Sequence, residues 1–384
     1  MKNRKLRMGM IGGGQGAFIG EVHRMAARLD GEIELVCGAF SSDPDRSRAS
    51  GKAFYLDPAR CYGNYEEMIH RENDLPADQR MDFVAIVTPN HLHFAPAKLA
   101  LQNGYHVICD KPVTLTSEQA LELKEIYDNS SLIFALTHNY TGYPMVRQAR
   151  AMIRAGELGT VRRVMVEYPQ GWLTTRIEES GQKQASWRTN PKKSGKAGCM
   201  GDIGTHAENL LEYVSGLKIT QLCASLHTFV DGRLLDDDGS VLLRLEGGAH
   251  GLLMASQICA GEENNLRIRV YGTKAGLDWC HESPNSLTIR PLDSAKYILR
   301  TGVGDLSSAA RAATRLPAGH PEGFIEAFAN IYRFFARAIR SQHSGEVSAD
   351  MDRDFPTLED GIRGMRFIDR VVESAQSDLK YIDF

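Results

Sequence analysis

The sequence predicts an α/β protein that begins with a doubly wound parallel sheet and continues into a larger α/β domain with an open, mainly antiparallel sheet. Apolar runs alternate with amphipathic segments through the first third of the chain, which is typical of a parallel sheet covered by helices. A glycine cluster at residues 12–14 follows the first apolar run. Beyond residue 137, strand-like runs follow one another with turn residues between them, which favours antiparallel pairing.

The elements of the first part follow from apolar continuity and capping residues. Strand candidates lie at 6–11, 33–39, 83–87, 107–109 and 132–136. The run at 83–87 is continuous in apolar residues, as expected when both faces of a sheet are covered. Helices are expected at 20–29 and at 95–102, where Gly104 supplies a terminating glycine. The capping-box residues Thr116-Ser117-Glu118-Gln119 begin a further helix.

The second part combines helices with a long series of strands. A helix is expected at 145–154, a polar surface loop at 174–198, and a helix around Asp202 and His206. Strands are expected at 161–168, 219–230, 241–245, 251–257, 266–271, 277–280, 287–289 and 297–299, and closing helices at 322–340 and 358–375. Since 384 residues exceed one ordinary core, we divide the chain into domains 1–137 and 138–384, with closing helices able to pack back on the first.

Composition excludes several classes of function. The net charge of −3 and the lack of a dense Lys/Arg tract give no reason to expect a nucleic-acid or membrane partner. Seven scattered cysteines without a CxxC pair indicate reduced thiols, hence a cytoplasmic protein without a metal site. No apolar stretch reaches the length of a membrane span, and the apolar run behind the basic N-terminus is too short for a signal peptide.

The glycine cluster predicts dinucleotide binding. Gly12, Gly14 and Gln15 lie between a strand and a helix, where backbone N–H groups can meet a pyrophosphate. An ordinary tight turn is the alternative. Ala17 stands where the third glycine of the pattern belongs, and Gly20 fills that role if three residues are inserted. This assignment makes residues 1–137 the dinucleotide-binding domain.

The residues after the second strand do not decide between NAD and NADP. An acid that binds the ribose hydroxyls of NAD is expected there, but the chain has Phe40, Ser41 and Ser42, with Arg46 shortly after. Serines and arginines accept the 2′-phosphate of NADP, although Ser41 also suits a turn. We expect NAD or NADP, with NAD slightly preferred.

Polar residues also follow the third and fourth strands. Thr88, Pro89, Asn90 and His93 come directly after the strand at 83–87 and are candidate cofactor ligands, because ligands bind at the carboxyl ends of such strands. Asp110 and Lys111 follow the next strand and join the same set, as does Asn139. Pro112 fixes the backbone after Lys111, so its ammonium is aimed and can relay a proton. A solvated lysine is the alternative.

Asp202 and His206 are four residues apart, on one face of a helix. His206 suits base chemistry near neutrality and Asp202 can orient it, although a helix cap and a surface histidine would look the same. The aromatic residue Trp172 precedes the polar loop at 174–198, and Trp187 and the cation Arg188 lie within it. They fit a sugar or a cofactor as well as they fit core packing.

The ordered set of motifs resembles the Gfo/Idh/MocA family of sugar and cyclitol dehydrogenases over the whole chain. The motifs are Ile11-Gly12-Gly13-Gly14, Thr88-Pro89-Asn90-His91-Leu92-His93, Asp110-Lys111-Pro112 in place of the usual Glu-Lys-Pro, Gly201-Asp202-Ile203-Gly204-Thr205-His206 and Leu358-Glu359-Asp360-Gly361. The resemblance implies a Rossmann domain, a catalytic group of Lys111, Asp202 and His206, and an open sheet that forms an oligomer interface. The segment 138–144 lacks the arginine often found there, which leaves the substrate unassigned.

We therefore expect reversible oxidation of a secondary ring alcohol, with His206 taking the proton and Lys111 polarising the oxygen. Substrate donors and acceptors are expected from Lys111, Asn139, Tyr143, Trp172, Asp202, His206 and His320. Two rival hypotheses are a family member that retains NAD for lyase or glycosidase chemistry and a non-catalytic dinucleotide sensor. A homodimer or homotetramer through the second domain's sheet is expected.

Overall fold

The computed structural model describes residues 4–345 and 353–384. Its chain divides into two compact units, Met1–Asn139 with Phe324–Ile362, and Tyr140–Gly323 with Arg363–Phe384. The first boundary lies two residues beyond the expected position of 137. The segment that begins at Phe324 groups with the first unit, so the division is not a single cut in the sequence.

The first unit contains the predicted parallel sheet, with strand order β2-β1-β3-β4-β5. Its strands are β1 (Leu6–Gly12), β2 (Ile33–Ala39), β3 (Phe83–Val87), β4 (His106–Cys109) and β5 (Phe134–Leu136). Neighbouring strands all pair in parallel. Every residue of β3 and β4 is buried, as the continuous apolar runs predicted. Because β2 and β3 flank β1 on opposite sides, the loop after β1 lies at the switch point where α/β sheets bind ligands.

Helices connect these strands or, in the case of the last one named here, pack against a helix that does. They are α1 (Phe18–Leu29), α2 (Pro44–Ala53), η1 (Pro58–Arg60), α3 (Tyr65–Asn73), η2 (Asn90–Leu92), α4 (Phe94–Gln102), α5 (Ser117–Asp128) and α11 (Phe324–Ser344). Sequence patterns assigned nothing to the segment that forms α2 and α3. Both begin at an N-cap: Asp43 accepts the backbone N–H groups of Asp45 and Arg46, and Asn64 accepts that of Glu67.

The second unit contains a nine-stranded sheet of order β13-β12-β11-β10-β6-β9-β8-β7-β14. Its strands are β6 (Val161–Pro169), β7 (Ile219–His227), β8 (Asp238–Leu245), β9 (His250–Ser256), β10 (Arg267–Gly272), β11 (Ala275–Cys280), β12 (Ser286–Pro291), β13 (Tyr297–Arg300) and β14 (Ile382–Asp383). All neighbours pair antiparallel except β6 and β9, which are parallel. The predicted α/β fold with a mainly antiparallel second sheet is confirmed.

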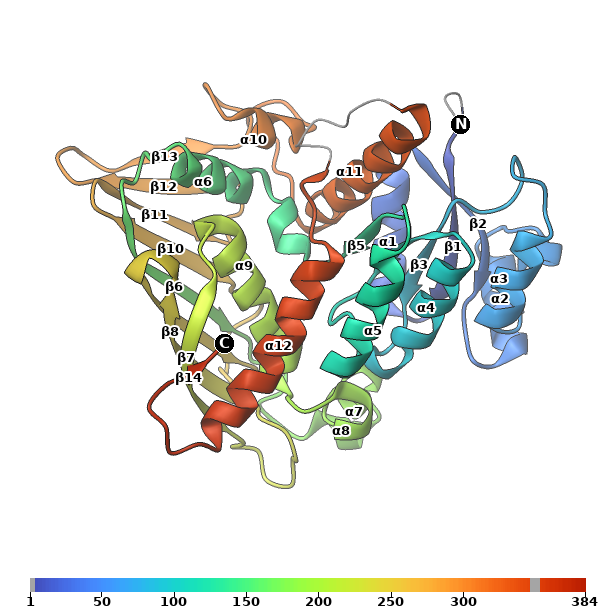
Figure 1. Ribbon diagram of the computed structural model, residues 1–384, viewed down its shortest axis with the longest axis horizontal. Helices are drawn as coiled ribbons and strands as arrows, with labels where there is room; N and C mark the ends of the chain where they lie inside the picture. The colour runs from blue at the N-terminus through green and yellow to red at the C-terminus, as the bar shows by residue number, and fades with distance from the viewer. Residues whose placement is uncertain (1–3, 346–352) are drawn as a thin grey trace. The chain divides into compact units, whose positions relative to one another are not determined.

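Helices α6 (Pro144–Arg154) and α9 (Thr205–Ser215) pack on one face of this sheet (Figure 1). The remaining helices are η3 (Asn139–Gly142), η4 (Ile177–Ser180), α7 (Lys183–Arg188), α8 (Pro191–Ser194), η5 (Met200–Gly204), η6 (Glu246–Gly248), α10 (Ser308–Ala312) and α12 (Leu358–Ala375), of which η3 and α12 cross the boundary between the units. The expectation of a loop over 174–198 was wrong. Short helices occupy much of it, and helices of four to six residues are too short to show hydrophobic periodicity.

Candidate active site

The glycine loop after β1 has the conformation that a phosphate-binding turn requires. Gly12, Gly13 and Gly16 have φ values of +80°, +69° and +75°, which residues with a side chain rarely adopt. A Cβ atom on Gly20 would lie 2.4 Å from the Cα of Gly13. Gly20 therefore lets α1 approach the loop closely, which is the packing role of the third glycine. Ala17 does not have this contact.

The loop is tied to the end of β2. The N–H of Gly14 donates to the carbonyl of Phe40 at 3.2 Å, and the N–H of Gln15 donates to Ser50 Oγ at 3.1 Å. A Cβ on Gly14 would lie 2.8 Å from both acceptors. Gly14 is therefore required by the protein's own packing, before any ligand is considered.

The residues after β2 separate into structural and exposed groups. Ser41 Oγ accepts the N–H of Asp43, whose carboxylate caps α2. Ser41 thus serves a turn, as its alternative interpretation held, and Asp43 serves as a helix cap. Ser42 and Arg46 are exposed, so their side chains are available to a ribose or to its phosphate.

His93 links the loops after β3 and β4. Its Nδ1 lies 2.7 Å from the carbonyl oxygen of Pro112 and its Nε2 lies 2.8 Å from that of Thr88. The ring is 1% exposed, and burial lowers the pKa of His93. With both nitrogens against backbone oxygens, His93 is placed to support these loops and not to touch a cofactor. Thr88 itself meets the glycine loop, since a Cβ on Gly12 would lie 2.8 Å from its methyl group.

Lys111 lies at the carboxyl end of β4 beside Asp110 and His138. Its backbone N–H donates to Asp110 Oδ1 at 3.1 Å, and the same oxygen accepts the hydroxyl of Thr137 at 2.6 Å. Burial, followed by the positive charge of Lys111, lowers the pKa of His138 to about 3. His138 is therefore neutral near Lys111 at neutral pH.

These residues of the first unit fit a dinucleotide. The left-handed glycines expose backbone at the switch point, and Asn139 is 3% exposed with its amide nitrogen lacking a hydrogen-bond partner within the described residues. A buried donor of this kind costs free energy unless a ligand or water accepts its hydrogen. Asn139 is thus a residue that a bound cofactor would complete.

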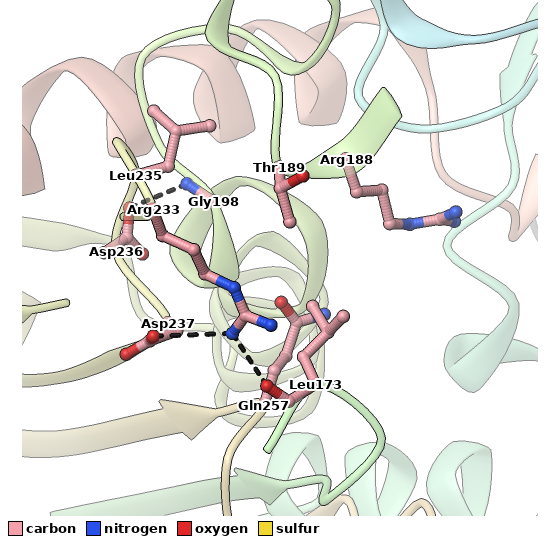
Figure 2. Close-up of a pocket in the computed structure, with 9 residues that line it drawn as sticks. All are labelled: Leu173, Arg188, Thr189, Gly198, Arg233, Leu235, Asp236, Asp237 and Gln257. Atoms are coloured by element: carbon pink, nitrogen blue, oxygen red, sulfur yellow. Dashed lines mark hydrogen bonds and ion pairs between the residues drawn. The ribbon is translucent and has the colours of Figure 1, made fainter. Parts of the chain in front are cut away.

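The second unit holds Asp202 in a π-helical turn, η5, that leads directly into α9. Single π turns are frequently found at functional sites. Asp236 fixes this turn: its carboxylate accepts the N–H groups of Gly198 at 2.7 Å and Met200 at 2.8 Å (Figure 2 shows the former). Burial raises the pKa of Asp236, although the two backbone donors oppose the rise.

Two side chains donate to the same oxygen of Asp202. Arg188 Nε lies 3.0 Å from Oδ2, and Gln257 Nε2 lies 2.9 Å from it. Arg188 also donates to Gln184 and stacks over the ring of Trp187, 4.4 Å from its centroid. The predicted cofactor ligands Trp187 and Arg188 are therefore brought together with the carboxylate of Asp202, which the sequence predicts to be catalytic.

His206 lies against two tyrosine rings. Its ring centroid is 5.0 Å from that of Tyr140 and 6.4 Å from that of Tyr168, and both rings meet it edge to face. The imidazole is 8% exposed. Burial raises the pKa of both tyrosines, so both hydroxyls stay protonated beside it.

Asn264 joins these tyrosines to the predicted substrate residue Trp172. Tyr140 and Tyr168 share a hydrogen bond, and Tyr168 donates to Asn264 Oδ1 at 2.7 Å. Gln170 Nε2 donates to the same oxygen at 2.6 Å, while its carbonyl accepts the indole N–H of Trp172 at 3.0 Å. A continuous polar network therefore runs from Trp172 to the residues that hold His206.

The two other predicted substrate residues differ: the ring of Tyr143 stacks on that of Tyr140, with centroids 6.4 Å apart, whereas His320 lies at an exposed position. Tyr143 is 2% exposed, and its hydroxyl lies 2.9 Å from Nε2 of His281. His320 is exposed, with Nδ1 3.1 Å from the carbonyl of Pro317. The substrate role of His320 stays a prediction.

The two donors to Asp202 also line a small pocket (Figure 2). Arg188, Gln257 and Thr189 line it, together with the ion pair between Arg233 and Asp237, whose closest atoms are 3.5 Å apart. Arg233 also donates to the carbonyl of Leu173 at 2.7 Å. Because Arg233 makes these contacts within the protein, its positive charge is balanced by the carboxylate of Asp237.

Sequence reasoning missed Gln257, Asn264, Tyr140 and Tyr168. Gln257 directly follows a strand, which is a position that α/β sites often use, but nothing in one sequence marks which polar residue there is functional.

In residues 4–345 and 353–384, no group of three or more His, Cys, Asp and Glu could hold a metal ion. Over the same residues, no helix combines the length and apolarity needed to cross a membrane.

Comparison with known proteins identifies the family. Residues 6–138 match the model of the oxidoreductase family with an NAD-binding Rossmann fold, and residues 146–278 match the GFO/IDH/MocA C-terminal domain. The chain belongs to the Gfo/Idh/MocA oxidoreductase family. It is 34% identical to the uncharacterized oxidoreductase YfiI of Bacillus subtilis (strain 168), over 100% of this chain and 98% of that protein.

Solved structures agree. An oxidoreductase from Sinorhizobium meliloti is 47% identical with a TM-score of 0.89, covering 99% of this chain and 100% of the other. An inositol dehydrogenase homolog from Azotobacter vinelandii, complexed with NADH and myo-inositol, is 35% identical with a TM-score of 0.91, covering 100% and 98%. This family member is thus an NAD-binding oxidoreductase.

Proposed function

We propose that the protein is an NAD(P)-dependent dehydrogenase that reversibly oxidises a secondary ring alcohol of a cyclitol or sugar to a ketone. The observation that carries the proposal is the π turn that holds Asp202 under two donors and continues into the helix bearing His206. A full-length relative complexed with myo-inositol and NADH supports a cyclitol as the substrate class.

Bound NAD would supply the hydride acceptor, held by the glycine loop and the strand-end residues of the first unit. His206 accepts the hydroxyl proton of the substrate. Asp202 keeps the imidazole oriented and stabilises its charged form. The ammonium of Lys111 hydrogen-bonds the reacting oxygen and stabilises the negative charge that develops on it.

NAD is the preferred cofactor in this proposal. The carboxylate nearest the end of β2, Asp43, is used in capping α2, so ribose selection falls to the exposed Ser42 and Arg46. The NADH-bound relative supports NAD.

All seven cysteines are free, which supports the expected cytoplasmic location.

The test is a screen of inositols, aldoses and glycosides with NAD and NADP, following the absorbance of the reduced cofactor. On the best substrate, His206→Ala and Lys111→Ala should each lower kcat by about 10²–10⁴-fold, the usual contribution of a general acid or base, with NADH affinity nearly unchanged. The oxidation rate should rise with pH through one ionisation that the His206 variant loses.

The matched control is His250→Ala, at an exposed position on β9. It should turn over like the natural protein. Near-full turnover of His206→Ala would refute the assignment and make Lys111 the leading base. Retained cofactor without net NADH formation would instead indicate lyase or glycosidase chemistry, and binding without any turnover would indicate a sensor.

A further inference from the structure

The carboxylate of Asp202 is oriented by residues outside its own helix. Arg188, on α7, and Gln257, just past β9, both donate to Oδ2. The side chain of Asp202 is 14% exposed and that of Arg188 is 23% exposed, whereas Gln257 is 2% exposed. Two donors from distant parts of the sequence thus meet at one oxygen, which fixes the plane of the carboxylate.

Gln257 is the more firmly held of the two donors. Its N–H donates to the carbonyl of Asp237 at 2.9 Å, and its own carbonyl accepts the N–H of Leu173 at 3.0 Å. Arg188 instead ends a helix of six residues and keeps a partly exposed guanidinium. We therefore separate their tasks: Gln257 sets geometry and Arg188 supplies charge.

Resting on the proposed function, we infer that Gln257 is a positioning residue for proton transfer, because its amide holds Asp202 in the orientation that serves His206. Arg188 complements the negative charge of the same carboxylate. Neither residue touches the reacting atoms in this assignment. Both residues line the same pocket (Figure 2).

The charged and titratable neighbours of Asp202 define what a pH profile would report. Burial is the main reason why the pKa values of Tyr140, Tyr168 and Cys199 are raised. The negative charge of Asp202 also raises each of these pKa values. These side chains remain protonated at neutral pH. His206 follows on the same helical segment, and Arg188 is the cation bonded to Asp202. Removing a donor to a charged carboxylate disfavours the charged form.

The experiment compares Gln257→Met, which keeps the volume but loses the amide, and Gln257→Glu, which keeps the shape but adds a like charge. Each should lower kcat by about 10–100-fold, the scale of a small misplacement near the chemistry, while KM and NADH affinity stay within about twofold. The acid limb of the kcat profile should move to higher pH in Gln257→Met.

The matched control is Thr189→Val, which lines the same pocket but donates its hydroxyl to the carbonyl of Ala185. It should keep the kcat and pH profile of the natural protein. An equal loss in Thr189→Val, or an unshifted profile with full kcat in Gln257→Met, would overturn the inference.

A second measurement separates this inference from the proposed function. Inactivity of the natural protein on every screened alcohol would refute the function alone. Melting temperatures of Gln257→Met, Asp202→Asn and the double variant test the contact without turnover. Non-additive shifts support coupling between the two side chains, and additive shifts refute it.

Discussion

Gly13 and Gly20 lie so close together that neither position has room for a side chain. The sequence left two candidates for the third glycine of the loop, Ala17 and Gly20, because spacing alone does not show where α1 meets the loop. The structure selects Gly20 through its contact with Gly13. Spacing located the motif, and three-dimensional packing was needed to assign the role.

Gly20→Ala should therefore push α1 away from the loop. We expect a loss of about 1–3 kcal/mol in the free energy of unfolding, the usual cost of overpacking, and at least about tenfold weaker NADH binding. Thermal denaturation and titration calorimetry measure the two effects. Unchanged affinity in a folded Gly20→Ala protein would contradict the assignment.

Gly364→Ala is the matched control within helix α12. A Cβ there would meet only Thr205 Cγ2, at the ordinary distance of 4.0 Å. It should leave NADH binding unchanged and raise stability by about 0.5–1 kcal/mol, because alanine has the higher helix propensity.

At the scale of elements, the strands were the most predictable parts. A buried strand such as β3 can be recognised in the sequence because its residues form an unbroken apolar run. The helices α2, α7 and α8 lack such a signal and depend on caps, for example Asn190 Oδ1 accepting the N–H of Lys192 at 3.0 Å. Arg188 was already a candidate from the sequence, but its shared bond with Gln257 to Asp202 could be found only once α7 and the end of β9 were packed.

Two elements of the first unit, α1 and β4, each bury a histidine. Burial lowers the pKa of His23 to about 4 and that of His106 to about 4. The unfolded chain binds these protons near pH 6.5, so the stability they contribute is present above pH 6.5 and is lost as pH falls toward 4. For fully buried His23 this amounts to about 3 kcal/mol.

His23→Gln should therefore flatten the decline of the melting temperature between pH 6.5 and 4. The nitrogen of glutamine can keep the contact that His23 Nδ1 makes with the Tyr332 hydroxyl at 2.6 Å. His250→Gln, at an exposed position, should leave the decline unchanged. Parallel curves for the natural protein and His23→Gln would disprove the linkage.

At the scale of the whole molecule, one face of the second sheet keeps apolar side chains at least partly exposed. Cross-strand neighbours Leu242, Leu252 and Met165 form an apolar row on it, and the row continues into Arg269 and Asp278. Leu242 is 44% exposed. Such a face favours association with a second copy, which is the homo-oligomer expected from the strand pattern.

Leu242→Glu should weaken that association at least tenfold, because a buried charge without a partner is costly. Light scattering over a range of micromolar concentrations measures it. Leu29→Glu is the matched control, at a leucine of 45% exposure on α1. A natural protein that is monomeric throughout would contradict the proposal.

The single parallel pair in the second sheet separates two tasks. Because β6 and β9 run side by side with Pro169 opposite Ser256, Gln170 and Gln257 leave the sheet at the same edge. Gln170 belongs to the network of Trp172 and Asn264, whereas Gln257 bonds to Asp202. Under the proposed function, substitutions on the Gln170 side change the substrate that binds while Gln257 preserves proton transfer, so a designer seeking new substrates should vary the Gln170 side first.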